Sequence, residues 1–324
     1  MENEEKKYNL ENPNEEPVKV DEEPLVLEAN KSAQNIEEMN VKRVKTLTKI
    51  GKIVMTALTY VFLVFIAIIV IFPFYWMLNS SLKSLAEYKW TKPSFFPHDI
   101  QWSNYLEAYK TANLGGLFLN TLFVGLVSTL LSLVITVLSA FAFARLEFKG
   151  KNAMFALLLA TMMIPGELFT ITNYATVHTF GWNSTFTVLI VPFLVSVFYI
   201  YLLRQNFMQV PNELYLAAKV DGTSDFKYLL KVMIPLALPT LISITILKMM
   251  GSWNSYIWPR LVANDDAHKL ITNGLRSAFT TTDGDTNYPV QMAAVAIVSA
   301  PLFLVFLFLR KYIMKGVSRS GIKG

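Results

Sequence analysis

Four long stretches of the chain contain no charged side chain, and this feature limits the possible folds more than any other. They cover residues 53–82, 111–144, 168–203 and 286–309. Because a helix needs about 20 apolar residues to cross the hydrocarbon core of a bilayer, each stretch is long enough to span a membrane. The 324-residue chain is 53% hydrophobic and only 16% charged, against about 25% in an ordinary soluble domain. A single water-soluble core is therefore not expected.

Two further stretches are apolar but shorter or interrupted. Asn152–Gly166 continues past Glu167, and Val232–Trp258 is interrupted once, by Lys248. The Pro165-Gly166 pair predicts a break or kink in the first of them. We therefore expect an all-α membrane protein with six transmembrane helices. Their predicted ranges are 53–79, 117–143, 153–176, 184–203, 232–258 and 289–309.

The distribution of Lys and Arg between the loops predicts the orientation. An even number of spans places both termini on one side of the membrane. From Lys42 onward, the loops and the end on that side hold 17 Lys and Arg, and the opposite loops hold 7. Short basic loops are retained in the cytoplasm. Both termini are therefore expected to be cytoplasmic.

The first 40 residues differ from the rest of the chain. Residues 1–40 contain 12 of the 24 acidic residues and only 4 Lys. A segment with so many charges and so few large apolar groups buries too little surface to offset its conformational entropy. We expect residues 1–40 to be a disordered cytoplasmic tail, and residues 41–324 to form one membrane domain.

Several kinds of chemistry are not supported by the sequence. The absence of cysteine excludes disulfides, Cys-ligated zinc and thiolate catalysis. The three histidines, His98, His178 and His268, are far apart and lack the spacing of metal ligands. No G-x-x-x-x-G-K-[ST] loop is present, so ATP binding is not assigned to this chain. We expect no cofactor and no metal bound by the chain itself.

The loop between the fourth and fifth spans, residues 205–235, carries the clearest functional signal. Its sequence predicts two short helices joined by a turn. Pro211 suits a first helical position, and Glu213 favours the positive end of the helix dipole. Gly222 can adopt the left-handed conformation that ends a helix, and the Thr-Ser pair after it can cap the next one. An amphipathic hairpin on the cytoplasmic side follows from this pattern.

The same loop resembles a known family. It is similar to the conserved cytoplasmic loop of membrane subunits of binding-protein-dependent ABC importers, with its Glu-Ala-Ala, Asp-Gly and Pro elements in order. The matching residues are Ala217, Ala218, Asp221, Gly222 and Pro235. Leu216 stands where the family has its leading Glu.

The resemblance extends over about residues 60–324 and is sharpest for the carbohydrate-uptake branch, in particular the second permease chain of maltose-type systems. Further matching segments are Phe74–Lys83, Ala140–Gly150, Met162–Pro165, Trp253-Asn254 and Gly316–Gly324. The resemblance implies the type I importer transmembrane fold. It also implies a multi-pass subunit of a bacterial cytoplasmic membrane.

The resemblance further implies partners and a division of labour. A second homologous permease, two ATP-binding subunits that use ATP and Mg, and an extracytoplasmic solute-binding protein would work with this non-catalytic chain. In the family the 205–235 loop rests in a groove of the ATPase, and its leading carboxylate helps to fix the fit. Leu216 can fill such a groove but cannot accept a charge-assisted hydrogen bond, for which Glu213 compensates only in part.

Residues near the outer end of the fifth span are candidates for the translocation pathway. Trp253, Asn254 and Tyr256 either mark a membrane interface or bind sugar rings and hydroxyls. Lys248 places an ammonium group within a span, where such a charge normally faces a polar cavity or a partner. It either favours substrates with a carboxylate or phosphate, or pairs with another subunit.

Other function classes remain as alternatives. An ion-coupled secondary transporter normally needs intramembrane carboxylates or ion sites at broken helices, and only Lys248 lies clearly within a span. A membrane enzyme with Ser252 as nucleophile lacks a histidine base within the spans. An ABC permease for a substrate that is not a sugar is a third alternative. The sequence favours a permease subunit for an oligosaccharide or related glycoside.

Overall fold

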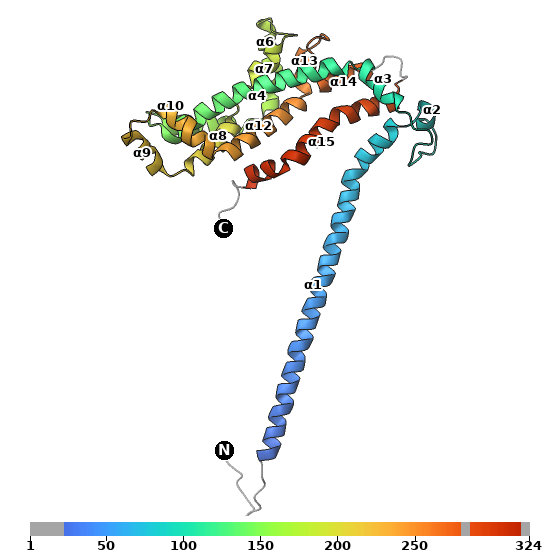
Figure 1. The fold of residues 1–324 in the computed structure, drawn as a ribbon, viewed down its shortest axis with the longest axis vertical. Coiled ribbons are helices and arrows are strands. Elements are labelled where there is room, and N and C mark those ends of the chain that lie inside the picture. The colour runs from blue at the N-terminus through green and yellow to red at the C-terminus, as the bar shows by residue number, and fades with distance from the viewer. Residues whose placement is uncertain (1–22, 280–285, 319–324) are drawn as a thin grey trace, which may run out of the picture. The chain divides into compact units, whose positions relative to one another are not determined.

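All regular elements in the described part of the chain are helices, as expected. The computed structural model describes residues 23–279 and 286–318, and no strand occurs within them. The chain divides into two compact units, Met1–Phe72 and Pro73–Gly324. The α-helices are α1 (Glu23–Ser81), α2 (Leu85–Tyr88), α3 (Ser103–Thr111), α4 (Leu114–Arg145), α5 (Lys151–Thr161), α6 (Thr170–Thr179), α7 (Phe186–Ile190), α8 (Val197–Met208), α9 (Asn212–Val220), α10 (Asp225–Tyr228), α11 (Ile234–Leu236), α12 (Leu238–Trp253), α13 (Ile257–Val262), α14 (Ile271–Phe279) and α15 (Tyr288–Ser318) (Figure 1). Short helical turns η1 (Gly166–Phe169), η2 (Val191–Phe193) and η3 (Leu229–Met233) join some of them.

The first helix begins earlier than the sequence predicts. α1 starts at Glu23, so residues 23–40 of the expected disordered tail are helical, and residues 1–22 lie outside the described residues. This segment contains Ala, Glu, Lys and Leu, which favour helices, and extending an existing helix costs little. The apolar side chains between Ile53 and Phe72 are exposed. A helix surrounded by lipid has this character.

In the part of the chain that the structure describes, three helices are long and apolar enough to cross a membrane unbroken. They are Lys42–Ser81 of α1, α4, and Tyr288–Arg310 of α15. Three pairs of shorter helices meet the same criterion together, each with a bend at a short break. The described residues thus supply six spans when each bent pair counts as one.

The bent pairs correct the predicted ranges of the third, fourth and fifth spans. α5 meets η1 and α6 at 82°, α7 and η2 meet α8 at 45°, and the segment Asp225–Leu236 meets α12 at 79°. Proline lies at or near each break and removes a backbone donor, which weakens helix continuity there. The break expected at Pro165 is confirmed. Residues 232–237, expected within the fifth span, lie across the bend from α12.

Close packing around α4 holds the second unit together. α4 contacts α8 and α12, and α15 lies beside α12 (Figure 1). Small or hydroxylated residues are buried along α4, among them Gly125, Ser128, Ser132 and Thr136. A Cβ atom added to Gly125 would lie 3.0 Å from Met249 Sδ of α12. Small residues of this kind allow helix backbones to approach closely in membranes.

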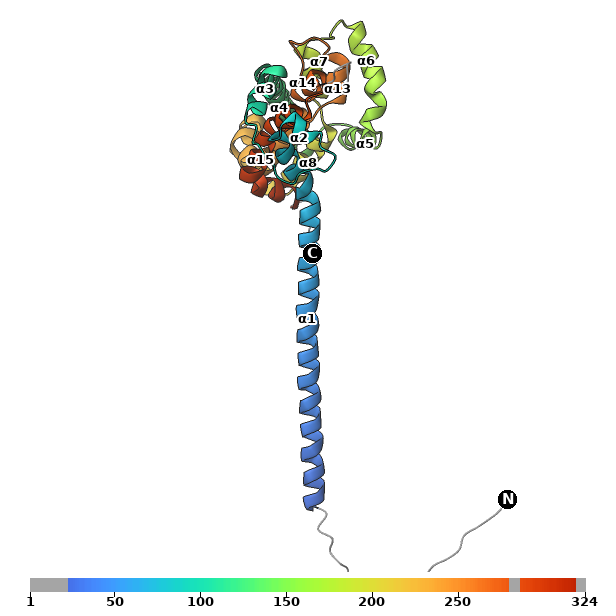
Figure 2. The same ribbon diagram turned by 90° about the vertical axis from the view of Figure 1, so that its right-hand side faces the viewer.

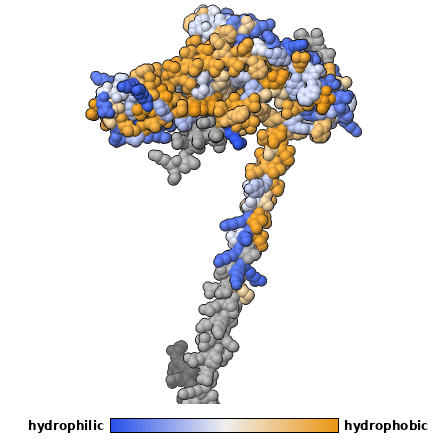
Figure 3. Space-filling view, in the orientation of Figure 1, coloured by the Kyte–Doolittle hydropathy of each residue, from blue (hydrophilic) through white to orange (hydrophobic). Residues whose placement is uncertain are grey.

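Polar and apolar residues separate along the second unit. Figure 2 shows α5 and α6 on one side of the helices and α3 and α15 on the other. In Figure 3 polar residues gather near α9 and α10 at one end and near α2 and α3 at the other, with an apolar band between them. This distribution matches a bundle that crosses a bilayer.

A small polar cluster orders the segment that follows α1. Lys83 and Glu87 are only 3% and 5% exposed. Glu87 accepts hydrogen bonds from Ser94 Oγ at 2.6 Å and from the His98 backbone N–H at 3.2 Å, while Lys83 Nζ donates to the Ser94 carbonyl at 2.5 Å. Burial raises the pKa of Glu87, but these hydrogen bonds outweigh it and hold the pKa below its ordinary 4.5. We call residues 82–102 the cap segment.

Candidate functional site

The loop 205–235 forms the helical hairpin that the sequence predicts. Gly222 has φ +70°, and its N–H donates to the Lys219 carbonyl at 3.0 Å. The N–H of Thr223 donates to the Ala218 carbonyl at 2.8 Å. This pair of bonds is the Schellman arrangement that ends a helix. Ser224 then accepts from the Lys227 N–H and caps α10.

Three side chains join the two helices of the hairpin. Asp225 Oδ1 of α10 accepts from Tyr215 Oη and lies next to Lys219 Nζ, each at 2.7 Å. The Lys219 ammonium also lies 5.4 Å from the centre of the Tyr215 ring. Its contact with Asp225 raises the pKa of Lys219 above its ordinary value. We call Tyr215, Lys219 and Asp225 the clasp, because they fix α9 against α10.

Arg145 ties the start of the hairpin to α4. This last residue of α4 is 8% exposed. Its Nη2 donates to the carbonyls of Phe207, at 2.8 Å, and Val210, and its Nη1 donates to Asn212 Oδ1 at 3.3 Å. One guanidinium group thus binds the end of α8 and the start of α9. A planar fork of donors is suited to such a multiple contact.

The outer side of the hairpin is apolar and exposed. Leu216 is 55% exposed and Val220, one turn later on α9, is 88% exposed. The other predicted loop residues Glu213, Ala217, Asp221 and Pro235 are also exposed, and Ala218 is partly buried. A groove of about 310 Å³ between the two helices is lined by Leu214, Ala217, Ala218, Asp221, Lys227 and Lys231. Such a surface favours contact with another chain.

A second feature is a cavity of about 350 Å³ between α4, α8 and α12. Lys248 lies in it, and its Nζ donates to the carbonyl of Phe193, where the fourth span breaks. The wall also includes hydroxyl groups and aromatic rings. The residues that supply these groups include Ser128, Ser196, Tyr199, Ser252, Ser255 and Trp258.

The structure separates the other pathway candidates. Asn254 and Tyr256 line a hollow of about 600 Å³ that also contains Glu167 and shares Phe193 and Trp258 with the Lys248 cavity. Trp253 is buried instead in a hydrophobic cluster, with its ring 5.6 Å from that of Phe118. Lys248, Asn254 and Tyr256 are thus brought to adjoining spaces, whereas Trp253 is not.

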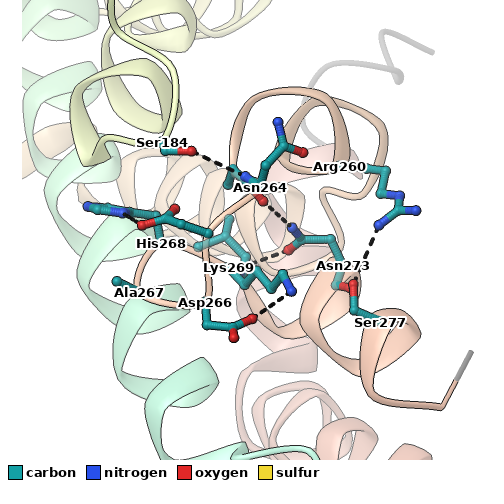
Figure 4. Close-up of polar contacts among 12 residues, drawn as sticks. Ser184, Arg260, Asn264, Asp266, Ala267, His268, Lys269, Asn273 and Ser277 are labelled. Atoms are coloured by element: carbon teal, nitrogen blue, oxygen red, sulfur yellow. Dashed lines mark hydrogen bonds and ion pairs between the residues drawn. The ribbon is translucent and has the colours of Figure 1, made fainter.

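The segment after α13 closes one end of the cavity. Leu270 and Pro259 contribute to the cavity wall. Asn273 holds the segment in shape: its Oδ1 accepts from the Leu270 N–H at 2.8 Å, and its Nδ2 donates to the Pro259 and Ala263 carbonyls at 3.3 Å. Figure 4 shows Asn273 between Asn264, Lys269 and Ser277.

The same segment is fixed to α4. Asn120 Nδ2 donates to the carbonyls of Ala267 at 2.8 Å and Lys269 at 3.0 Å, and Thr121 Oγ1 accepts from the Ile271 N–H at 2.8 Å. These contacts join residues about 150 positions apart. The cavity therefore has a well-anchored wall at this end.

The histidines lie in separate surroundings. His98 contacts Glu87 at 3.0 Å, His178 contacts Asn183 at 2.7 Å and His268 contacts Asp265 at 2.6 Å. Within residues 23–279 and 286–318, no group of three or more His, Asp or Glu side chains could hold a metal ion.

Several of these contacts were not predicted from the sequence. The sequence places Arg145 within a family motif but does not predict its contacts with the hairpin. It also does not predict the clasp of Tyr215, Lys219 and Asp225. A signal did exist for the last two, since a basic residue near the end of one helix and an acidic residue at the start of the next are natural partners across a tight turn. The hydroxyls around Lys248 come from three helices and have no common sequence pattern.

The comparisons with known proteins agree with this architecture. The melibiose/raffinose/stachyose import permease protein MelC of Bacillus subtilis is 32% identical over 259 residues, which cover 78% of this chain and 91% of that one. The diacetylchitobiose uptake system permease protein NgcG of Streptomyces coelicolor is 28% identical over 254 residues, covering 78% and 84%.

A solved structure has the same fold. It is a bacterial ABC transporter involved in the import of the acidic polysaccharide alginate, and the superposition has a TM-score of 0.73 at 23% identity, covering 80% of this chain and 96% of that chain. The family model for the binding-protein-dependent transport system inner membrane component matches residues 38–319. The chain therefore belongs to this family and is a membrane-embedded permease of the ABC importer type.

Proposed function

We infer that this permease forms one half of the translocation pathway for an oligosaccharide or a related glycoside. Two observations support the substrate class. The relatives NgcG and MelC are permeases for diacetylchitobiose and for melibiose, raffinose and stachyose. The adjoining spaces around Lys248 and Asn254 also combine aromatic rings with hydroxyl and amide groups, which suits the apolar faces and the hydroxyls of sugars.

The proposal assigns energy coupling to partner subunits. A second homologous permease would complete the pathway, and an extracytoplasmic solute-binding protein would deliver the substrate. Two ATP-binding subunits would hydrolyse ATP with Mg, while this chain remains non-catalytic. Both termini and the loop 205–235 would then lie in the cytoplasm, in accord with the 17 to 7 distribution of Lys and Arg.

The observation that carries the proposal is the rigid hairpin with an exposed apolar face. Leu216 and Val220 project outward while the clasp fixes the hairpin from within. Burying one such Leu side chain in a groove of the ATPase contributes about 1.5–3 kcal/mol. Glu213, Ala217, Ala218, Asp221 and Gly222 would shape the same contact, and the small Ala side chains permit close approach.

The structure also supports a route for the movement. A displacement of the hairpin acts on α4 through Arg145 and on α12 through the 79° bend beyond Pro235. Both helices line the Lys248 cavity. ATP-driven movement of the loop would therefore change access to the pathway, which is the rigid-body type of switching.

Crosslinking tests the coupling role. A Leu216→Cys variant of the complete assembly is expected to form a disulfide with a Cys introduced on the ATPase surface, and the yield should change when ATP is added. A Cys in place of Lys110 on α3 serves as the control and should not crosslink. Failure of every position along the hairpin to capture the ATPase would refute the coupling role.

Transport in sealed membrane vesicles separates the alternatives. Uptake that requires ATP and the binding protein is expected, whereas uptake driven by an ion gradient without ATP would indicate a secondary transporter. A panel of sugars and other small solutes then tests the substrate class. Uptake of solutes without any sugar, together with rejection of all saccharides, would favour the ABC permease for another substrate.

A further inference from the structure

The ammonium group of Lys248 has N–H donors that no other described residue accepts. An ammonium group carries three N–H donors. One of them is used by the Phe193 carbonyl at the break of the fourth span. The side chain lines the cavity of about 350 Å³, so the remaining donors can reach a ligand there.

The positive charge of Lys248 is also not neutralised. Within residues 23–279 and 286–318, Lys248 forms no ion pair with a carboxylate, and the residues that line the cavity include neither Asp nor Glu. A cation within a span is costly unless it meets water or an opposite charge. The cavity thus presents one positive charge with no negative charge in its wall.

The residues around the ammonium group form a continuous polar face. Lys248, Gly251 and Ser252 follow one another at i, i+3 and i+4 near the end of α12, so they lie on one side of that helix. Ser255, just after the end of α12, lines the same cavity. A Cβ atom added to Gly251 would meet nothing within 4 Å. Gly251 therefore leaves open space directly beside the charge.

Other helices complete this face. Ser128 of α4 and Tyr199 of α8 add hydroxyl groups, and the Trp258 ring forms an apolar wall. Trp258 is fixed by the bond from its Nε1 to the Val188 carbonyl at 2.9 Å. Hydroxyl groups can donate to an oxyanion or bond to sugar hydroxyls, and the ring can pack against a sugar.

We propose that this cavity is a subsite for an acidic glycoside, in which the Lys248 ammonium binds a carboxylate or phosphate group of the substrate. The proposal rests on the proposed function and adds the charge of the substrate to it. The hydroxyl face would hold the sugar beside the charged group. A neutral sugar of the same shape would occupy the same space without the ionic contact.

Equilibrium binding to the purified assembly in nanodiscs, without the binding protein, tests the subsite. The probes are digalacturonate, its neutral dimethyl ester, and a disaccharide monophosphate with its unphosphorylated parent. Lys248→Met is expected to weaken binding of at least one acidic probe by about 10- to 100-fold, as for loss of a charged hydrogen bond. Binding of the neutral partner should change by less than about threefold, and the acidic probe that responds identifies a carboxylate or a phosphate as the preferred group.

Two further variants separate charge from structure. Lys248→Arg should retain most of the preference for the acidic probe, because the positive charge and the donors remain. Lys110→Met removes an exposed charge of α3 outside the cavity and should leave the preference unchanged. If Lys248→Arg retains the preference for the acidic probe and Lys248→Met loses it, a merely steric effect is excluded.

Several results would overturn the proposal. One is equal weakening of acidic and neutral probes by Lys248→Met, since Lys248 would then act only by holding the Phe193 carbonyl. Another is loss of the second permease on purification of this variant, which would show that Lys248 pairs with that subunit. A wild-type assembly that transports a neutral oligosaccharide but shows no preference for either acidic probe would overturn the subsite alone. If no saccharide is transported at all, the proposed function itself fails.

Discussion

Replacement of Arg145 by Met tests whether α4 holds the hairpin in place. Arg145 is nearly buried, and its guanidinium group binds the Phe207 and Val210 carbonyls and the Asn212 side chain. Met retains much of the apolar stem but has no donor. The substitution therefore removes the contacts of α4 with the end of α8 and the start of α9 while leaving the helix propensity of α4 almost unchanged.

The size of the effect follows from the acceptors that lose their donor. The Phe207 carbonyl keeps the Val210 N–H as a donor at 3.2 Å, whereas the Val210 carbonyl loses its side-chain donor. A buried acceptor left without a partner costs about 1–3 kcal/mol, so Arg145→Met predicts about 1–3 kcal/mol for local opening of this region. Asn212→Ala removes only the 3.3 Å contact and should cost about 0.5–1.5 kcal/mol. The ranking of the two variants is thus part of the prediction.

Hydrogen–deuterium exchange of the complete assembly measures this opening. In Arg145→Met, protection of the backbone N–H groups in residues 205–215 should fall by about fivefold or more, since about 1 kcal/mol corresponds to that factor. The control Lys149→Met removes an exposed cation of the adjacent loop and should leave protection unchanged. Exchange in Arg145→Met that equals the wild type would refute the assigned role of Arg145.

Three further predictions concern the hairpin turn, the clasp and the cap segment. Gly222→Ala should lower the stability of the hairpin by about 1 kcal/mol, since φ is +70° there, and Gly222→Asn should cost less, because Asn tolerates this conformation better; exchange rates in α9 measure both, and equal effects would contradict a backbone origin. Asp225→Asn weakens a partly exposed ion pair, so exchange in α9 should rise only by a factor of about 1.4 to 5, as for a loss of about 0.2–1 kcal/mol. The pKa of Glu87 is lowered by folding, so its contribution to stability is present above pH 4.5 and is lost as the pH falls through the folded pKa, below 4.5; the difference in thermal stability between wild type and Glu87→Gln should shrink over this range, and a difference independent of pH would contradict the assignment.

Local sequence chemistry was sufficient to predict the hairpin. The left-handed turn at Gly222 and the cap that follows it depend on residues within a few positions of one another. The long apolar helices α4 and α15 were predicted for the same reason, because their length and composition are properties of a single segment. Signals of this kind do not depend on the rest of the fold.

Contacts between distant segments could not be predicted in this way. Arg145 reaches acceptors more than 60 positions later in the chain, and Trp253 is drawn into a cluster with Phe118 that no local pattern indicates. The angle of the bend in the third span and the existence of a bend in the fifth span were also not predicted, because a proline weakens a helix without fixing the angle that follows. Composition was a poor guide for residues 23–40. Their many charges predicted disorder, but the same residues are good helix formers and belong to α1.

Because the segment Asp225–Leu236 meets α12 at 79°, a movement of the hairpin would tilt α12. The 16 residues of α12 make an arm of about 24 Å. A tilt of about 10° at its first turn displaces its far end by about 4 Å, which exceeds the thickness of a water molecule. If the hairpin couples to an ATPase as proposed, a movement that tilts α12 would displace Trp253 by this amount and the wall near Lys248 by a little less.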